Sequence, residues 1–208
     1  MDLFFRESEP GDVSVAADAV FDMWFRKDYG EDMGRWVSDA YAAICYVRAD
    51  VRITAMLDGI PEGVCFASSG KGGEHIGSPL EAYSDREGYD RAVHDIGLLH
   101  RADDELRQKF SIGTDAEIVL LIVGRRSRGL GVGRRLLSEA CNALRERGCG
   151  DFMLFTDDDC DFGFYDRIGM ERAGSVTVDF NGYPLERIAY TQRLRWKPKY
   201  PNCGFPHR

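Results

Sequence analysis

A basic, glycine-rich turn follows the apolar run at residues 118–123. Gly129, Gly131 and Gly133 stand at alternate positions, and a helix is expected after them over residues 134–147. Glycine lets a backbone turn tightly and approach a ligand closely. The free N–H groups and positive dipole end at the start of a helix favour an anion. The arginines that add positive charge to this turn are Arg125, Arg126, Arg128, Arg134 and Arg135. The sequence therefore predicts a site for a phosphorylated ligand.

Two common phosphate-binding motifs do not fit the spacing of this turn. A dinucleotide-binding fingerprint requires G-x-G-x-x-G, but the third residue after Gly131 is Arg134. A P-loop requires Lys and then Ser or Thr after its last glycine, whereas Leu130 follows Gly129. A glycine-rich loop that binds no ligand is the simple alternative.

The turn is part of a longer ordered pattern. Arg128-x-x-Gly131-x-Gly133 has the form (Q or R)-x-x-G-x-(G or A), and the strand Glu117–Val123 precedes it. Downstream, Phe164–Met170 reads F-Y-D-R-I-G-M, close to an F-Y-x-x-x-G-F signature. In this order, the three features resemble the GNAT superfamily of acyl-CoA-dependent N-acetyltransferases.

The resemblance covers residues 115–193 firmly and residues 12–69 loosely, and it implies acetyl-CoA as a co-substrate. The N–H groups of the turn would wrap the pyrophosphate, and the pantetheine amides would pair with the preceding strand. In the family, the N–H at the position of Val123 contacts the acetyl carbonyl, where a fixed donor acts as an oxyanion hole. The residues implied in cofactor binding are Leu121, Ile122, Val123, Arg128, Gly129, Leu130, Gly131, Val132, Gly133, Arg134 and Asp158.

The resemblance also implies two residues for proton transfer. Glu117 opens the central strand eleven residues before Arg128, an offset at which several family members place a general base. Its alternative is a strand-end glutamate that faces solvent or pairs with an arginine. Tyr165 matches the family tyrosine that protonates the departing thiolate, and a phenol can donate at neutral pH. Its alternative is a core tyrosine whose hydroxyl caps a backbone group.

An acidic run follows the expected strand at residues 152–156. Its members are Asp157, Asp158, Asp159 and Asp161. Seven residues before the tyrosine the family commonly has an asparagine, whereas this chain has Asp158, which puts the contact of that position with CoA in question. The run either attracts a cationic amine or forms a solvated loop.

Composition limits the classes of function. The 208 residues suit one domain, and a hydrophobic content of 44% suffices for a packed core. The net charge of −8 argues against general nucleic-acid binding, and it suits either a cationic substrate or simple solubility. No run reaches the ~18 apolar residues of a membrane span, and the N-terminus lacks the features of a secretory signal. We therefore expect a cytoplasmic protein without nucleic-acid or membrane partners.

The cysteines show neither C-x-x-C pairs nor a histidine at zinc-ligand spacing, so no metal site is expected. They are interpreted as thiols in a reducing compartment. Cys160 lies near the expected site, where it is either an inert side chain or a reactive thiol. The six are Cys45, Cys65, Cys141, Cys149, Cys160 and Cys203.

Hydrophobic periodicity predicts the elements that would position the site. Asp58-Gly59 and Asn181-Gly182 are signals for hairpin turns. Helices are predicted at residues 15–28, 32–47 and 134–147, and strands at residues 51–57, 63–69, 117–123, 152–156, 170–179 and 186–193.

Residues 70–115 depart from the family pattern, whose connection at this place is brief. An amphipathic helix is expected there, as an insert on the acceptor side of the cleft. The insert is either a lid or substrate wall, or a packed elaboration, or a surface for a homodimer. The helix positions expected on or near one face are Tyr89, Val93, Ile96, Leu99, Leu106 and Phe110. The tail at residues 194–208 receives no role.

The sequence thus predicts one GNAT-type α/β domain over residues 1–208, a mixed, mostly antiparallel twisted sheet flanked by helices and split like a V at its central strands. The expected activity is transfer of an acetyl group from acetyl-CoA to a primary amine, preferably of a small molecule, by direct attack in a ternary complex. A protein or peptide amine is the second choice of acceptor. The competing hypothesis is an acyl-CoA-binding sensor that transfers nothing.

Overall fold

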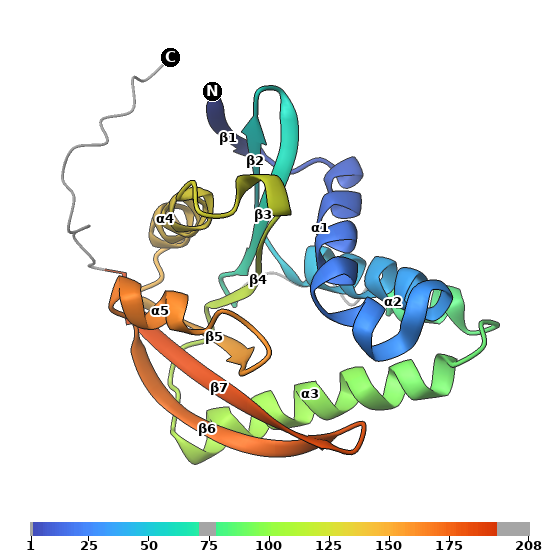
Figure 1. The fold of residues 1–208 in the computed structure, drawn as a ribbon. Coiled ribbons are helices and arrows are strands. Elements are labelled where there is room, and N and C mark those ends of the chain that lie inside the picture. Colours follow the sequence, from blue (N-terminus) through green and yellow to red (C-terminus); the bar gives the residue numbers. More distant parts are fainter. Residues whose placement is uncertain (1, 71–77, 195–208) are drawn as a thin grey trace.

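A seven-stranded sheet with helices on its faces forms the core of the protein (Figure 1). The structure, a computed structural model, describes residues 2–70 and 78–194. The strands lie in the order β1-β2-β3-β4-β5-β7-β6, and among them only β4 and β5 pair in parallel. The predicted fold class is therefore confirmed. The strands are β1 (Leu3–Glu7), β2 (Val51–Leu57), β3 (Ile60–Ser68), β4 (Glu117–Val123), β5 (Asp151–Asp157), β6 (Glu171–Phe180) and β7 (Tyr183–Arg193).

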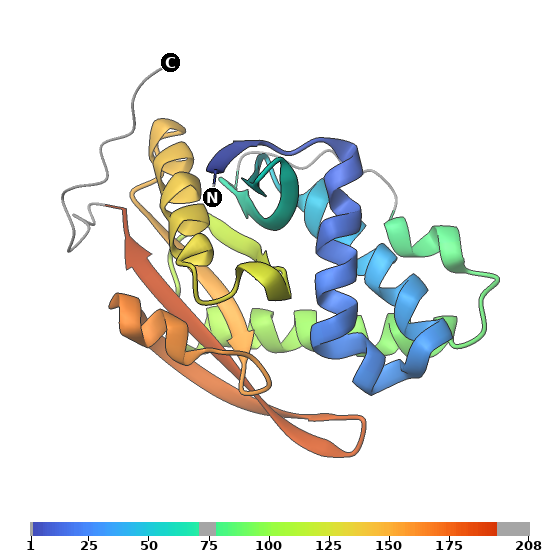
Figure 2. The ribbon, with the colours of Figure 1, turned by 45° about the horizontal axis from the view of Figure 1, so that its top comes forward.

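The helices cover both faces of the sheet. One face of β2–β4 carries α4 and the other carries α1 and α2, as the two views of the ribbon show (Figures 1 and 2). In residues 2–70 and 78–194, no helix is long and apolar enough to cross a membrane. The helices described are α1 (Val13–Val20), α2 (Arg26–Arg48), α3 (Tyr89–Lys109), α4 (Val132–Glu146) and α5 (Gly163–Ile168).

Strand β3 shows how one strand serves both layers. Successive side chains of a strand point to opposite faces of the sheet. Val64 and Phe66 accordingly pack in the core beneath α1 and α2, whereas Cys65 and Ala67 pack in the core beneath α4. All four side chains are fully buried, so β3 is apolar throughout this stretch rather than alternating.

Both predicted hairpins are present. Asp58 and Gly59 have φ of 50° and 79°, and Asn181 and Gly182 have φ of 54° and 85°, as two-residue hairpin turns require. The strands extend closer to the turns than predicted, since β3 begins at Ile60 and β7 at Tyr183. The edge strand β1, which pairs antiparallel with β2, was not predicted.

The two predicted N-terminal helices are joined more closely than expected. A single π-helical turn, Phe21–Phe25, connects α1 to α2, and α2 is interrupted at Gly30, where φ is 77°. Such π turns often occur at functional sites. This one brings Met23 and Trp24 to the pocket described below.

The helix expected in the insert is α3, and it joins two parts of the molecule. Ile96 packs with the core beneath α1 and α2, and Leu106 packs in a cluster with residues of β6 and β7. In Figure 1, α3 runs alongside these two strands. Val93 and Phe110 were expected on or near the inward face, but they are 42% and 36% exposed. The inward face instead uses the small Ala92 and Ala102, which allow the helix to approach its neighbours closely, and Asp95, which accepts the Tyr29 hydroxyl at 2.9 Å.

The sheet splits between β4 and β5, as predicted. The two strands pair only at Glu117↔Met153 and Ile118↔Leu154. The register of β4 against β3 also shifts next to this point, between Phe66 and Ala67. Such a bulge bends a strand and increases its twist. The remaining length of β4 therefore diverges from β5 and leaves a slot between them.

Candidate active site

A pocket of about 640 Å³ occupies this slot and continues beyond both of its ends. One end is the glycine-rich turn, and the other lies between the N-terminal helices, α3 and the β6–β7 hairpin. The predicted site residues that line it are Glu117, Leu121, Ile122, Val123, Arg128, Gly129, Gly131, Val132, Gly133, Arg134 and Tyr165. The structure therefore brings together most of the predicted site.

The turn ends in a helix that starts two residues earlier than predicted. Gly131, with φ of 76°, is the N-cap residue of α4, and the helix begins at Val132. The first hydrogen bond of this helix runs from the N–H of Arg135 to the carbonyl of Gly131. The N–H groups before it, on Val132, Gly133 and Arg134, have no helical acceptor. They stand at the pocket wall, where the helix dipole favours an anion.

A buried glutamate that sequence analysis missed anchors the turn. The register of β2 and β3 shifts where Glu62 lies in β3. The Glu62 carbonyl accepts the N–H of Gly124 at 2.7 Å, and its carboxylate accepts the Ser127 hydroxyl at 3.2 Å. Arg126 forms an ion pair with the same carboxylate at 3.2 Å. These contacts fix the stretch between β4 and the glycines.

Two predicted cofactor-binding residues do not line the pocket. Leu130 is 44% exposed on the outside of the turn. Asp158 bridges β5 to β7, because its carboxylate accepts the N–H of Glu186 at 3.0 Å while its own N–H donates to the Glu186 carbonyl at 3.1 Å. A structural contact of this kind explains an acidic residue here, and contact of Asp158 with CoA stays a prediction.

Tyr165 reaches the pocket from α5. Its ring packs against Phe164 and Tyr190, with ring centroids 5.2 and 5.4 Å away. No hydrogen bond joins its hydroxyl to another group in the described part of the chain, which differs from a core tyrosine that caps the backbone. Burial, together with the nearby Cys160 thiol, raises the pKa of Tyr165. The phenol therefore keeps its proton at neutral pH.

Cys160 lies beside Tyr165 in the pocket wall but is poorly suited to nucleophilic attack. Its thiol donates to a carboxylate oxygen of Asp157 at 2.9 Å. Burial and the neighbouring Asp157 raise the pKa of this thiol to about 12. Because the thiolate is the reactive form of cysteine, we expect no acyl-cysteine intermediate.

Replacement of Cys160 by alanine is accordingly expected to lower kcat/KM by less than about fivefold, the effect of losing one weak hydrogen bond of ~1 kcal/mol. Initial rates of acetyl transfer would test this, together with the mass of the protein after incubation with acetyl-CoA alone. Complete loss of activity in Cys160→Ala would contradict direct transfer. So would acetylation of the wild-type protein that does not occur in Cys160→Ala.

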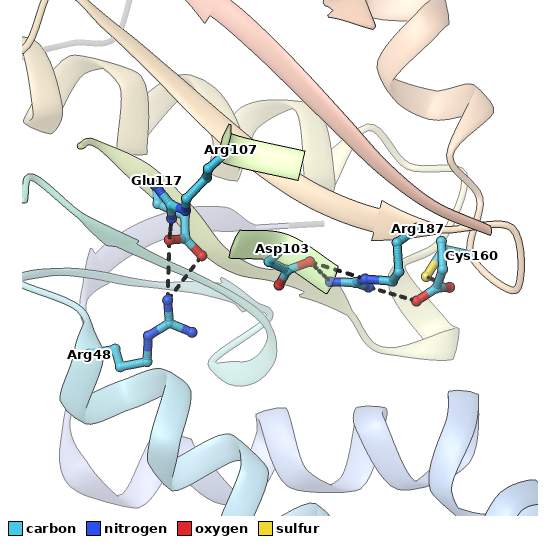
Figure 3. A network of polar contacts seen from close by, with 7 residues as sticks. Arg48, Asp103, Arg107, Glu117, Cys160 and Arg187 are labelled. Carbon is cyan, nitrogen blue, oxygen red and sulfur yellow. Dashed lines mark hydrogen bonds and ion pairs between the residues drawn. The ribbon is translucent and has the colours of Figure 1, made fainter. Parts of the chain in front are cut away.

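Glu117 is buried at the start of β4 and paired with two arginines (Figure 3). Arg48 of α2 contacts both of its carboxylate oxygens at 3.2 and 3.3 Å. Arg107 of α3 donates to one of them at 2.6 Å. The arginine-paired arrangement that sequence analysis kept as an alternative is thus present, and Glu117 as a general base stays a prediction.

A second charged group lies farther along the pocket and was not predicted. Arg187 of β7 donates to Asp103 of α3 at 2.7 and 3.2 Å and to Asp157 of β5 at 3.0 Å. Figure 3 shows this group beside the Glu117 group. The side chain of Arg187 is only 10% exposed. The three residues tie the inserted helix to the split sheet.

The far end of the pocket is both aromatic and acidic. Trp24, Phe180 and Tyr183 line it together with Asp28 and Asp159. Burial and the neighbouring Asp159 raise the pKa of Asp28, although the adjacent Lys27 opposes them. The indole N–H of Trp24 is buried and has no hydrogen-bond partner in the described ranges. The ammonium group of Lys27 already pairs with Asp159 at 2.8 Å and lies 5.5 Å from the centre of the Tyr183 ring. The same kinds of group suit an organic cation with an apolar body.

A protein-family model matches the glycine-rich turn and the elements on either side of it. Residues 97–170 match the model of the acetyltransferase (GNAT) family. Over this stretch the chain resembles the GNAT acetyltransferases. It contains β4, the glycine-rich turn, α4, β5 and Tyr165, so the resemblance drawn from the motifs is confirmed. No match is found among curated proteins.

Solved structures extend the likeness to nearly the whole chain. A putative GNAT acetyltransferase from Desulfovibrio desulfuricans is 14% identical, covers 93% of this chain and 99% of its own, and has a TM-score of 0.55. An aminoglycoside 6'-N-acetyltransferase complexed with coenzyme A is 14% identical, with coverage of 94% and 99% and a TM-score of 0.57. The ribosomal-protein-S18-alanine N-acetyltransferase from Escherichia coli is 11% identical, with coverage of 98% and 100% and a TM-score of 0.57. At these identities the structures share the GNAT fold with this chain.

Proposed function

We propose that this protein transfers an acetyl group from acetyl-CoA to a primary amine of a small molecule, by direct attack in a ternary complex. The observation that carries the proposal is the continuous pocket. It joins an anion-binding helix start, a slot along an open strand edge and an acidic, aromatic chamber. A pocket of this form can hold a phosphorylated, amide-bearing thioester at one end and an organic cation at the other.

The turn and β4 would hold the cofactor. The helix-start N–H groups would bind the pyrophosphate, and the positively charged Arg128 and Arg134 line the same stretch of pocket. The edge of β4 that β5 leaves unpaired would bind the pantetheine amides as a neighbouring strand does. The Val123 N–H, aimed at the acetyl carbonyl, would stabilise the charge that develops on its oxygen.

Proton transfer requires an acid for the leaving thiolate and a base for the amine. Tyr165, a protonated phenol in the pocket wall, is proposed as the acid. Glu117 was predicted as the base from the resemblance. Both of its oxygens are occupied by arginines, so it can accept a proton only after one of these pairs opens. Arg48, whose side chain is 40% exposed, is the partner more open to solvent.

Two other hypotheses about function compete with this proposal. The E. coli structure named above is of an enzyme for ribosomal-protein-S18 alanine, which favours a peptide amine as the second candidate acceptor. A sensor that only binds acyl-CoA is the other. We further propose a cytoplasmic location, since no disulfide joins the five described cysteines.

A panel of amines with acetyl-CoA separates these readings. The panel contains 2-phenylethylamine, tyramine, spermidine and a short peptide with free N-terminal and lysine amines. The proposal predicts release of the CoA thiol together with an acetylated small amine. Acetylation of the peptide alone would favour the second acceptor class. Binding of acetyl-CoA with no release of thiol for any amine would favour the sensor.

A further inference from the structure

Glu117 and Asp103 are two of the carboxylates that line the pocket, and they differ in how their oxygens are used. Both oxygens of Glu117 accept hydrogen bonds from arginines. Asp103 of α3 receives both of its hydrogen bonds, from Arg187, on the same oxygen, Oδ1. Within the described chain, no group donates to its Oδ2. A new ligand can therefore bind to Asp103 without breaking an existing contact.

Asp103 also lies between two cavities. It lines the main pocket and a second cavity of about 230 Å³, and its side chain is 17% exposed. The residues around this second cavity are Arg48, His100, Asp103, Asp104, Arg107, Glu117 and Phe155. Asp103 therefore borders a second cavity that is lined mainly by charged residues as well as the main pocket.

Resting on the proposed acetyl transfer, we propose that Asp103 binds the ammonium group of the acceptor and removes its first proton. The N–H bond breaks, its electron pair stays on nitrogen, and the proton moves to Oδ2 of Asp103. The neutral amine then forms the C–N bond at the thioester carbon, and the C–S bond breaks. The thiolate takes the proton of Tyr165, whose oxygen regains one from the product nitrogen. Asp103 later returns its proton to water.

The surroundings of Asp103 suit this exchange. Burial raises the pKa of its carboxyl group, and the facing guanidinium groups of Arg187, Arg48 and Arg107 oppose that rise. Arg187 is shared with Asp157, so its charge is divided between two carboxylates. The titratable and charged groups that surround Asp103 are Arg48 and Tyr41 of α2, His100, Asp104 and Arg107 of α3, Glu117 of β4, Asp157 of β5 and Arg187 of β7.

The expected pH dependence of kcat/KM follows from the raised pKa of Asp103. A base works only when it is deprotonated, so kcat/KM should rise with pH and level off above the raised pKa of Asp103. It should fall only above the pKa of the free amine, where the ammonium form that Asp103 binds is lost. Without the base, the amine must lose its proton in solution. The rate of such a variant should keep rising about tenfold per pH unit toward the pKa of the free amine.

The test measures kcat/KM between about pH 5 and pH 10, with acetyl-CoA and the amine that wild type acetylates fastest in the panel above. The variants are Asp103→Asn, Asp103→Glu, Glu117→Gln and, as a matched control on an exposed position of α3, Glu105→Gln. Titration with desulfo-CoA shows whether each variant is folded with an intact cofactor site. If wild type acetylates no amine, the proposed function itself fails, whatever the variants do.

We expect Asp103→Asn to lose about 100-fold or more at neutral pH, to keep its desulfo-CoA affinity and to lose the plateau. Glu105→Gln should match wild type, and Asp103→Glu should keep a plateau at a shifted pH. An unchanged profile in Asp103→Asn, or loss of the plateau in Glu117→Gln alone, would overturn the proposal. If Asp103→Asn fails to bind desulfo-CoA, the pH profile of Asp103→Glu tests the proposal in its place. A kcat/KM plateau that begins at the same pH as in wild type would then overturn it.

Discussion

Replacement of Gly131 by glutamate is expected to lower the affinity for CoA at least about 100-fold, because like charges placed together cost several kcal/mol. The new carboxylate would stand at the N-cap of α4, beside the N–H groups proposed to bind the pyrophosphate. The φ of 76° at this position also disfavours any side chain. Titration calorimetry with desulfo-CoA, which cannot react, would measure the loss.

The chain offers a closely matched control for this change. Gly59, in the β2–β3 turn, has φ of 79°, is exposed and has no atom within 4 Å of an added Cβ, as at Gly131. Gly59→Glu thus introduces the same charge and a backbone strain of ~1–3 kcal/mol far from the pocket. It should bind desulfo-CoA like wild type. Equal affinities for all three proteins would remove the turn from the cofactor site.

Replacement of Tyr165 by phenylalanine is expected to lower kcat by about 100-fold to 1,000-fold, within the range for loss of a general acid. The affinity for desulfo-CoA should change little, because the ring and its packing against Phe164 and Tyr190 remain. The raised pKa of Tyr165 means that the phenol stays protonated over the working range, so its own ionisation should not limit the rate at neutral pH.

Tyr190→Phe separates loss of a proton donor from loss of a structural hydroxyl. The Tyr190 hydroxyl donates to Asp166 at 2.8 Å, and its ring is buried outside the pocket. Removal of this hydroxyl should lower the free energy of unfolding by ~1–2 kcal/mol and leave kcat within a few fold of the wild-type value. A wild-type kcat in Tyr165→Phe would exclude the tyrosine as the acid, whatever the stability of Tyr190→Phe.

The parts of the site that sequence analysis predicted depend on local signals. The apolar β4, the alternate glycines and the start of α4 lie within 17 consecutive residues, where spacing alone indicates their geometry. The Asp58-Gly59 and Asn181-Gly182 turns likewise specify their hairpins. The observed ends of helices and strands differ from the predicted ends by a few residues, because packing rather than propensity decides the last turn of a helix or the last pair of a strand.

The parts that were missed depend on contacts between distant segments. Arg48 and Glu117 are 69 residues apart, and Asp103 and Arg187 are 84 residues apart. Nothing in the local pattern of α3 distinguishes Asp103 from the acidic residues that face solvent beside it. The signal available was weaker: an inserted helix near the acceptor side that carries charged residues within its apolar stripe. Asp95, buried in the same helix, shows that such a residue need not mark the pocket.

Asp158 shows what spacing against a motif leaves undetermined. Its distance from Tyr165 in sequence matches a position that contacts CoA in the family, and in the structure its carboxylate accepts the Glu186 N–H at 3.0 Å. A single residue more or less in such a turn changes the direction of a side chain, which spacing against a motif does not capture.

The proposed function requires the pocket between β4 and β5 to hold acetyl-CoA and to deliver its acetyl group to an amine. Mass spectrometry of the amine panel after incubation with acetyl-CoA, using wild type and Gly131→Glu side by side, would show whether both steps occur. We expect an acetylated small amine with wild type and none above background with the variant. No acetylated product with a folded wild type that binds acetyl-CoA, or equal product with both proteins, would contradict it.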